Sequence, residues 1–289
     1  MWLQLIWRLG CVRVLIGGRD APELAGVRMG AKKRDSVFAA FSCVHAPHHN
    51  PVAVERAIAA IPRGCTDLVC LGDLFDGHAA SVHPDEAKHT LFDEYESAAG
   101  VLEQFRAAVP KTCNLFWLLG NHEANTQAPD KRRIPRGLRD SIHWNNSPWC
   151  DVFQRWSQTD YQCPSRHNRM AGTVQLGQVI FTHGFKTQDM AEAHSVWEAS
   201  DFHPHRLIVR GHTHRPMCVT QRTIGKQLVL PLWSANAGTL VQLSPPPNYM
   251  MRKDTNRWGP AVVRGTCRVN TPSRFASRQW EAETVMLDG

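Results

Sequence analysis

The chain has 289 residues, of which 43% are hydrophobic, so it is long enough to bury the core of one large domain. Its 33 basic and 26 acidic side chains give a net charge of +7, which permits an anionic substrate or a nucleic acid without requiring either. No apolar run is long enough to span a membrane, and nine cysteines without a CxxC spacing exclude a regular disulfide framework, which favours a reducing, cytoplasmic location.

The apolar start of the chain is interrupted by Arg8 and Arg13, so it is too short and too charged to span a bilayer. Residues 1–35 are expected to form a poorly ordered extension, or else the start codon is placed too early and Met29 is the more natural beginning. Residues 36–289 are expected to form a single domain, since no boundary within them isolates a second one. Inside this domain, residues from about 125 to 170 form an insertion that breaks the pattern of strands and helices. An insertion of this length beside a site is usually a lid or a specificity loop.

The segment between the extension and the insertion alternates between strand and helix patterns. Short apolar runs predict strands at residues 37–41, 67–71 and 114–119. A helix is predicted at residues 51–61, with Asn50 as its N-cap and Pro51 at its first position. A second helix is predicted at residues 84–109, ended by Pro110. This order of elements predicts a sheet with crossover helices.

The insertion contains the basic run Lys131–Arg139, which is either a phosphate-contacting lid or an ordinary mobile loop. At most short helices are expected in the insertion, near Arg136 and Val152. Three tryptophans in it either stack on nucleic-acid bases or pin the insertion to the core: Trp144, Trp149 and Trp156.

After the insertion the sequence is mostly of strand type, apart from a short helix predicted at residues 190–197. Two hairpins are expected, one turning at Gly177 and one at Gly225. The predicted strand segments are residues 173–181, 207–210, 217–232, 261–269 and 280–287.

Polar clusters follow five of the apolar strand runs at the point where each ends. These clusters are Ser42–His45, Gly72–Asp73, Gly120–Glu123, Thr182–Gly184 and Gly211–His214. The carboxyl ends of strands are where an α/β sheet builds its sites. Because each cluster presents His, Asp, Asn or Cys, the five together predict one metal centre.

The side chains in these clusters suit two divalent ions that share a carboxylate, such as Mn, Fe, Zn or Ni. Asp73 is the expected bridge. His45 and His214 are expected to complete one ion's ligands, and the other ion's are expected to be Asn121, His183 and His212. His122 is then free to protonate a leaving oxygen or to bind a phosphate.

The ordered set of motifs resembles the calcineurin-like metallophosphoesterase superfamily, and the resemblance spans residues 37–215. The superfamily pattern of DxH, GDxxD, GNH[ED], a lone His and GHxH corresponds here to Cys43–His45, Gly72–Asp76, Gly120–Glu123, His183–Gly184 and Gly211–His214. The first two motifs look most like those of small phosphoesterases of bacteria and their phages. The resemblance implies an α/β fold, with two mixed β-sheets in a sandwich flanked by helices, and the ligand roles given above.

One position departs from the superfamily pattern, because Cys43 stands where the first aspartate is expected. Cys43 is either a soft thiolate ligand that favours Zn or Fe, or a non-ligand that leaves one ion weakly held. The branch of RNA lariat debranching enzymes also carries CxH, although the GDxxD form here differs from that branch.

Four further residues near the motifs are given supporting or surface roles. Asp76 is expected either to orient a ligand histidine or only to cap the turn before Gly77. Glu123 is expected to make supporting contacts rather than to bind metal. His48 and His49 are expected to be surface residues.

The expected function is metal-dependent hydrolysis of phosphate esters, phosphodiesters above all, by a metal-bound hydroxide at a dinuclear site. A nuclease or other nucleic-acid phosphodiesterase, including a debranching activity, is the first alternative. A non-catalytic scaffold with a degraded metal site is the second. The sequence assigns no substrate-binding residue, natural substrate or oligomeric state.

Overall fold

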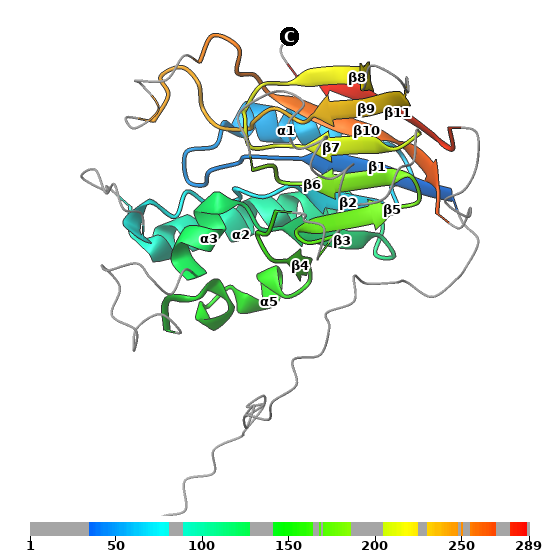
Figure 1. Ribbon diagram of the computed structural model, residues 1–289. Coiled ribbons are helices and arrows are strands. Elements are labelled where there is room, and N and C mark those ends of the chain that lie inside the picture. The colour runs from blue at the N-terminus through cyan, green and yellow to red at the C-terminus, as the bar shows by residue number, and fades with distance from the viewer. Residues whose placement is uncertain are drawn as a thin grey trace, which may run out of the picture. The chain divides into compact units, whose positions relative to one another are not determined.

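The structure is a computed structural model. It describes residues 35–80, 89–127, 141–163, 168, 170–185, 205–224, 230–247, 250, 255–269 and 278–287 (Figure 1). The expected extension, apart from its last residue, the basic run Lys131–Arg139 and the helix predicted at 190–197 lie outside these residues. No helix within the described ranges is long and apolar enough to cross a membrane.

The first sheet has six strands in the order β11-β10-β1-β2-β3-β4 (Figure 1). Their bounds are β1 Asp35–Phe41, β2 Asp67–Cys70, β3 Asn114–Leu118, β4 Ser157–Thr159, β10 Ala261–Arg268 and β11 Trp280–Met286. Strands β1 to β4 pair in parallel, and β10 and β11 are antiparallel. The parallel pairing of the first three strands agrees with the predicted crossover helices. Strand β4 was not expected, because its three polar residues form a strand only through pairing with β3.

The second sheet has five strands in the order β5-β6-β7-β9-β8. Their bounds are β5 Thr173–Leu176, β6 Val179–Thr182, β7 Leu207–Arg210, β8 Met217–Ile224 and β9 Leu230–Asn236. The two predicted hairpins are the antiparallel pairs β5–β6 and β8–β9. Gly177 lies in the first turn with a left-handed φ of 57°, and residues 225–229 of the second turn lie outside the described ranges.

The helices confirm the predicted pattern with two differences. Their bounds are α1 Pro51–Ala59, α2 Leu91–Ala107, α3 Asn121–Gln127 and α5 Cys150–Phe153, with 3-10 turns η1 His78–Ala80 and η2 Trp144–Asn146. Helix α1 is capped as expected, since the Asn50 side chain accepts hydrogen bonds from two backbone N–H groups. Helix α2 begins at Leu91 rather than at residue 84, because Thr90 and Asp93 form a capping box there. Helix α3, which was not expected, begins directly at the GNHE motif.

Alternate residues of the central strands enter two different cores. Phe38, Val69 and Phe116 face the second sheet, where they pack against residues such as Phe181 and Val209. Their neighbours Phe41, Cys70 and Trp117 face the helices. Both faces of the central strands β1 to β3 are therefore buried, which explains why these strands are mostly apolar. The predicted fold class, an α/β protein with two mixed sheets and helices, is confirmed.

The tryptophans of the insertion belong to the helix-side core. Trp144 and Trp156 are only 0% and 2% exposed, and Trp149 is partly buried against the same cluster. Of the two interpretations given to these side chains, pinning to the core is correct for Trp144 and Trp156. The interpretation that these two stack on nucleic-acid bases is wrong, since neither ring reaches the surface.

Candidate metal centre

The five motif loops meet at the carboxyl ends of strands from both sheets. The loops after β1 and β2 are joined where the backbone N–H of Cys43 donates to Gly72 O (3.0 Å) and that of His45 to Asp73 O (2.9 Å). Across the sandwich, the loops after β6 and β7 are joined by Gly211 N–H donating to His183 O (3.0 Å). The loops that follow β1 and β2 emerge on the left of Figure 1. Side chains distant in sequence are thereby brought to one place.

The backbone of the motif loops is in the left-handed conformation at several non-glycine residues. Among the described residues, the non-glycine residues with positive φ are Cys43, His45, Asp73, His212 and His214, at 49–67°. All five are candidate ligands. The left-handed conformation costs such residues about 1–3 kcal/mol each, and it clusters at functional sites. The strain is thus concentrated where side chains must turn inward to a common point.

The first group of converging side chains contains Cys43, His45, Asp73 and His214, all of them buried. Their donor atoms lie within 4.8 Å of one another. The Nε2 atoms of His45 and His214 are 3.0 Å apart, and His45 Nε2 is 3.8 Å from Asp73 Oδ2. Cys43 is therefore part of this group, as its place in the CxH motif predicts.

The second group contains Asp73, His183 and His212 and so shares its carboxylate with the first. Asp73 Oδ2 is 3.2 Å from His183 Nε2, which is 3.3 Å from His212 Nδ1. The Asn121 Oδ1 atom is 3.2 Å from the same His183 nitrogen. All seven candidate ligands thus lie in two adjoining groups around Asp73.

The donor atoms suit bound metal ions. An ion with bonds of 2.0–2.2 Å places neighbouring ligand atoms about 3.0–3.6 Å apart, which is the range of most of these separations. The other nitrogens of two rings are already engaged, since His45 Nδ1 lies 3.1 Å from Asp76 Oδ1 and His183 Nδ1 donates to Leu71 O at 2.6 Å. These contacts turn both Nε2 lone pairs toward the groups, as metal-binding histidines require.

The charge states of three histidines also suit metal binding. Burial is the main cause that lowers the pKa of His45 and His214, and it lowers the pKa of His212 to about 3. These rings are therefore neutral at pH 7 and present lone pairs. Burial opposes ionisation of Asp73, but His183, His122 and His45 together outweigh it and hold the pKa of this carboxyl well below its usual range. Burial acts to lower the pKa of His183, but Asp73 outweighs it and raises this pKa.

Beside the two groups, Asp76 lies close to two further imidazoles, those of His122 and His48. The Nδ1–H of His122 donates to the carbonyl oxygen of Asp76, and the same nitrogen is 3.4 Å from Asp76 Oδ1. Burial acts to lower the pKa of His122, but Asp73 and Asp76 outweigh it and raise this pKa to about 10. His48 Nε2 lies 4.0 Å from Asp76 Oδ2, so His48 borders the site rather than standing apart on the surface. Asp76 has the orienting position that was one of its two expected roles.

Glu123 holds two of the motif loops together. Its buried carboxylate accepts hydrogen bonds from the backbone N–H groups of Asp73 (3.0 Å), Leu74 (2.6 Å) and Gly120 (2.7 Å). Burial raises the pKa of this carboxyl to about 7. A Cβ on Gly120 would lie 2.2 Å from Asp73 Oδ1, so a glycine is required where the two loops approach. Glu123 therefore supports the ligands, as expected, and does not join either group.

Sequence reasoning missed several supporting residues. Glu94 of α2 accepts the backbone N–H groups of Gly77 (2.5 Å) and His78 (3.2 Å), and Thr239 Oγ1 donates to Cys43 O (2.7 Å). Asn236 Nδ2 donates to Gly211 O (3.2 Å). Of these residues, only Asn236 could have been suspected from the sequence, since it precedes a glycine turn at the end of an apolar run.

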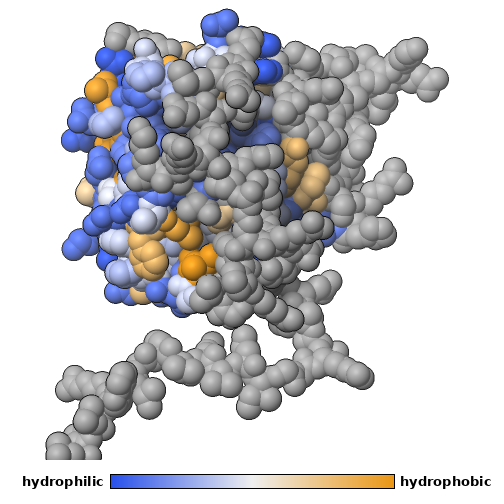
Figure 2. All heavy atoms as spheres, turned by 90° about the vertical axis from the view of Figure 1, so that its left-hand side faces the viewer, coloured by the Kyte–Doolittle hydropathy of each residue, from blue (hydrophilic) through white to orange (hydrophobic). Residues whose placement is uncertain are grey.

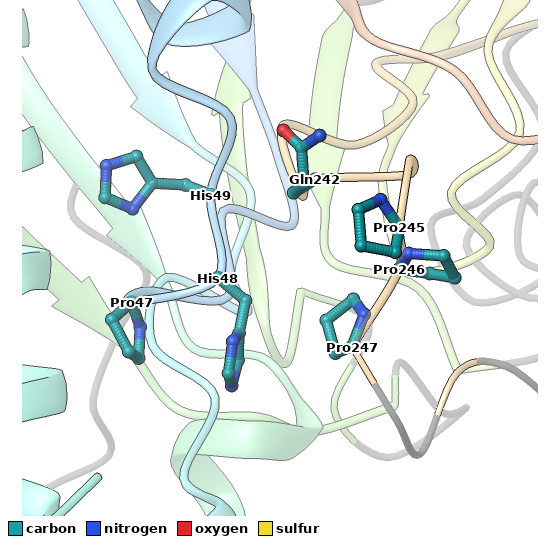
Figure 3. Close-up of a pocket in the computed structure, with 7 residues that line it drawn as sticks. All are labelled: Pro47, His48, His49, Gln242, Pro245, Pro246 and Pro247. Atoms are coloured by element: carbon teal, nitrogen blue, oxygen red, sulfur yellow. The ribbon is translucent and has the colours of Figure 1, made fainter. Parts of the chain in front are cut away.

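A shallow cavity of about 290 Å³ adjoins the His48 side of the site. Figure 3 shows Pro47 and His48, from the loop after β1, opposite Pro245, Pro246 and Pro247, from the loop after β9. His49 and Gln242 complete its lining. Figure 2 shows the face on which the loops after β1 and β2 emerge, where hydrophilic residues are mixed with small hydrophobic areas.

The chain belongs to the calcineurin-like phosphoesterase family, whose model matches residues 36–216. Membership supports metal-dependent phosphoester hydrolysis, since the family generally binds divalent metals and the structure has matching groups of ligands. The resemblance stated from the motifs is thereby confirmed. No curated protein matches the chain.

Several solved structures show a distant likeness. Vps29 from Chaetomium thermophilum is 11% identical, with a TM-score of 0.36, over 86% of this chain and 97% of that one. A predicted phosphoesterase from Streptococcus pneumoniae TIGR4 is 11% identical, with a TM-score of 0.36, over 89% and 92%. Yfce, a phosphoesterase from E. coli, is 17% identical, with a TM-score of 0.34, over 88% and 100%. Likenesses at this level do not bear on the activity of this chain.

Proposed function

We propose that the protein hydrolyses phosphodiesters with the help of two divalent ions bound at the two groups of ligands. The observation that carries the proposal is the position of Asp73, whose carboxylate belongs to both groups. A bridging carboxylate is what two ions about 3.5–4 Å apart require. The substrate is an anion, which fits the excess of basic over acidic side chains in the chain.

Each ion has its own set of ligands in this proposal. Cys43, His45 and His214 would hold one ion, Asn121, His183 and His212 would hold the other, and Asp73 would be shared by both. Divalent ions at these positions supply Lewis acidity, which lowers the pKa of a water and takes up charge on the phosphoryl oxygens.

His122 is the residue that passes a proton to the leaving oxygen. Its Nδ1–H is committed to the carbonyl oxygen of Asp76, which fixes the tautomer and makes Nε2 the nitrogen that exchanges a proton with the substrate. Diesters depend on such a group, because an alkoxide leaves poorly without a proton. Asp76 orients the ring and stabilises its positive charge.

In this proposal Cys43 binds a metal ion through its sulfur. Its sulfur accepts a hydrogen bond from His212 N–H (3.3 Å) and lies 3.0 Å from Ser42 Oγ. Burial raises the pKa of the thiol, so a cation beside it is needed to hold the thiolate. A thiolate ligand favours Zn or Fe over Mg or Mn.

The test is hydrolysis of an activated phosphodiester and its monoester by metal-stripped protein refilled separately with Mn, Fe, Zn or Mg. We expect the diester to be cleaved, with Zn or Fe most effective in the natural protein. Cys43→Asp is expected to shift the preference toward Mn or Mg, because its ligand is harder.

His122→Ala tests whether His122 transfers the proton to the leaving oxygen. It should lose about 10²–10⁴-fold in kcat on the diester while binding the same amount of metal. If no metal restores hydrolysis to the natural protein or to Cys43→Asp, the enzyme proposal fails and a scaffold role takes its place.

A further inference from the structure

Trp258 contacts a candidate ligand from outside the segment that the family model matches. Its ring centroid lies 4.3 Å from that of His214, and the two rings are close to perpendicular at 78°. The matched segment ends at residue 216, so no family motif predicts this contact. Trp258 is partly exposed, whereas His214 beneath it is only 5% exposed. The tryptophan therefore borders the site and leaves part of its surface exposed.

The backbone that follows Trp258 is fixed to the site. Gly259 N–H donates to His214 O (3.1 Å), and Thr239 N–H donates to Gly259 O (3.0 Å). Gly238 forms a bridge with Pro260, and a Cβ on Gly238 would lie 2.2 Å from Gly259 O. The ring is thus held beside His214 by three neighbouring backbone contacts, which gives it the rigidity that a binding surface needs.

A second aromatic pair borders the other group of ligands. The Tyr161 ring lies 5.8 Å from the His183 ring, and it stacks on Phe185 at 4.7 Å. Both side chains are partly exposed. Planar side chains therefore stand beside a histidine of each group, with Trp258 next to His214 and Tyr161 next to His183.

We propose that Trp258 is a stacking surface for a planar, aromatic substituent of the phosphate ester, such as a nucleobase. The proposal rests on the proposed function and names the substrate class for the same site. A phosphoryl group at the ligand groups would lie next to His214, and an ester substituent directed to this side of the site would meet the indole. Stacking on a tryptophan is strong for any flat aromatic ring. Such a surface therefore favours planar substituents in general rather than one particular base.

The test compares the binding of AMP and ribose 5-phosphate to the metal-loaded protein by titration calorimetry. The two ligands share the phosphate and the ribose and differ only in the base. We expect AMP to bind about tenfold more tightly to the natural protein, since stacking on an aromatic side chain has roughly that effect. Trp258→Ala should reduce this ratio to about one without changing the affinity for ribose 5-phosphate. Trp258→Phe should retain part of it.

Trp149→Ala is the matched control, because Trp149 is also partly buried but packs near Phe92, at a ring distance of 6.4 Å. It should leave the ratio unchanged. The proposal is overturned if the natural protein shows no preference for AMP, or if Trp258→Ala weakens both ligands and the bound metal together, which a purely structural role would produce.

The hydrolysis assay separates this inference from the proposed function. Diester cleavage without any preference for AMP rejects the stacking surface alone. A preference for AMP that depends on Trp258, in a protein that cleaves no ester with any metal, rejects the hydrolase and leaves the aromatic binding surface in place.

Discussion

Two buried aspartates stand at opposite ends of β2 and behave differently. Asp67 is the first residue of the strand and is 1% exposed, whereas Asp73 follows its end and is 2% exposed. Asp67 accepts hydrogen bonds from neutral side chains, namely Ser36 Oγ (2.6 Å), Thr66 Oγ1 (2.7 Å) and Asn114 Nδ2 (2.6 Å). Its charge is satisfied within the protein.

Asp73 has imidazoles and a backbone N–H around it instead. Its Oδ2 lies 3.2 Å from His183 Nε2 and 3.8 Å from His45 Nε2, and His122 N–H donates to its Oδ1 (3.1 Å). Its backbone is left-handed, with φ at 51°. Imidazole nitrogens gathered around a shared carboxylate are an arrangement that suits a bound cation.

The comparison shows that burial alone does not distinguish a structural carboxylate from a functional one. What distinguishes them is the chemistry of the neighbouring side chains: hydroxyl and amide donors complete Asp67, whereas imidazole rings that can bind metal surround Asp73 Oδ2. The same strand thus has a closed polar network at its amino end and an open one at its carboxyl end. Isosteric substitutions at the two ends test this difference.

The largest effect is expected from Asp73→Asn. Removing the shared carboxylate should lower kcat/KM on an activated diester about a thousandfold, since the ions contribute several kcal/mol to the transition state. The bound metal, measured by elemental analysis, should fall at the same time. Circular dichroism of the variant should match the natural protein. Full metal content in the variant would contradict the bridging role.

A smaller loss is expected from Glu123→Gln, which replaces an acceptor for three backbone N–H groups by a side chain with only one acceptor oxygen. Loosening the support behind Asp73 should weaken metal affinity about 10–100-fold, as changes behind metal ligands commonly do. Competition with a chromophoric chelator measures this affinity. Unchanged affinity together with lower stability would make Glu123 a structural residue only.

The smallest effect on activity is expected from Asp67→Asn. The free energy of unfolding, measured in urea, should fall by about 1–3 kcal/mol, because a buried network loses a charged acceptor. Activity per folded molecule and metal content should equal those of the natural protein. A variant that lost metal would show that the two ends of β2 are coupled.

Much of the fold was predictable because its signals are local. Strands β1, β2 and β3 are mostly apolar, and Asn50 with Pro51 marks the start of α1 unambiguously. The start of α2 was predicted too early, because helical spacing continues upstream of the cap at Thr90. Strand β4 has no apolar pattern of its own, and its pairing with β3 makes it a strand.

The candidate ligands were predictable because each stands in a short motif at a strand end. Their supports were not, because these act across the fold. Glu94 reaches the loop of Gly77 from the side of a helix, and Thr239 reaches Cys43 across almost two hundred residues. Trp258 likewise approaches His214 from a segment without any motif. No spacing rule connects such pairs.

The position of β1 has a consequence for how the molecule is made. This strand lies at the centre of the first sheet, and one of its two neighbours is β10, with Asp35 opposite Arg268. A ribosome therefore releases β1 long before its partner is translated, and one edge of the nascent strand waits unpaired through most of synthesis. Open strand edges pair readily with other chains. Until β10 is synthesised, the exposed edge of β1 can therefore pair with other chains, and the growing chain depends on chaperones to prevent aggregation.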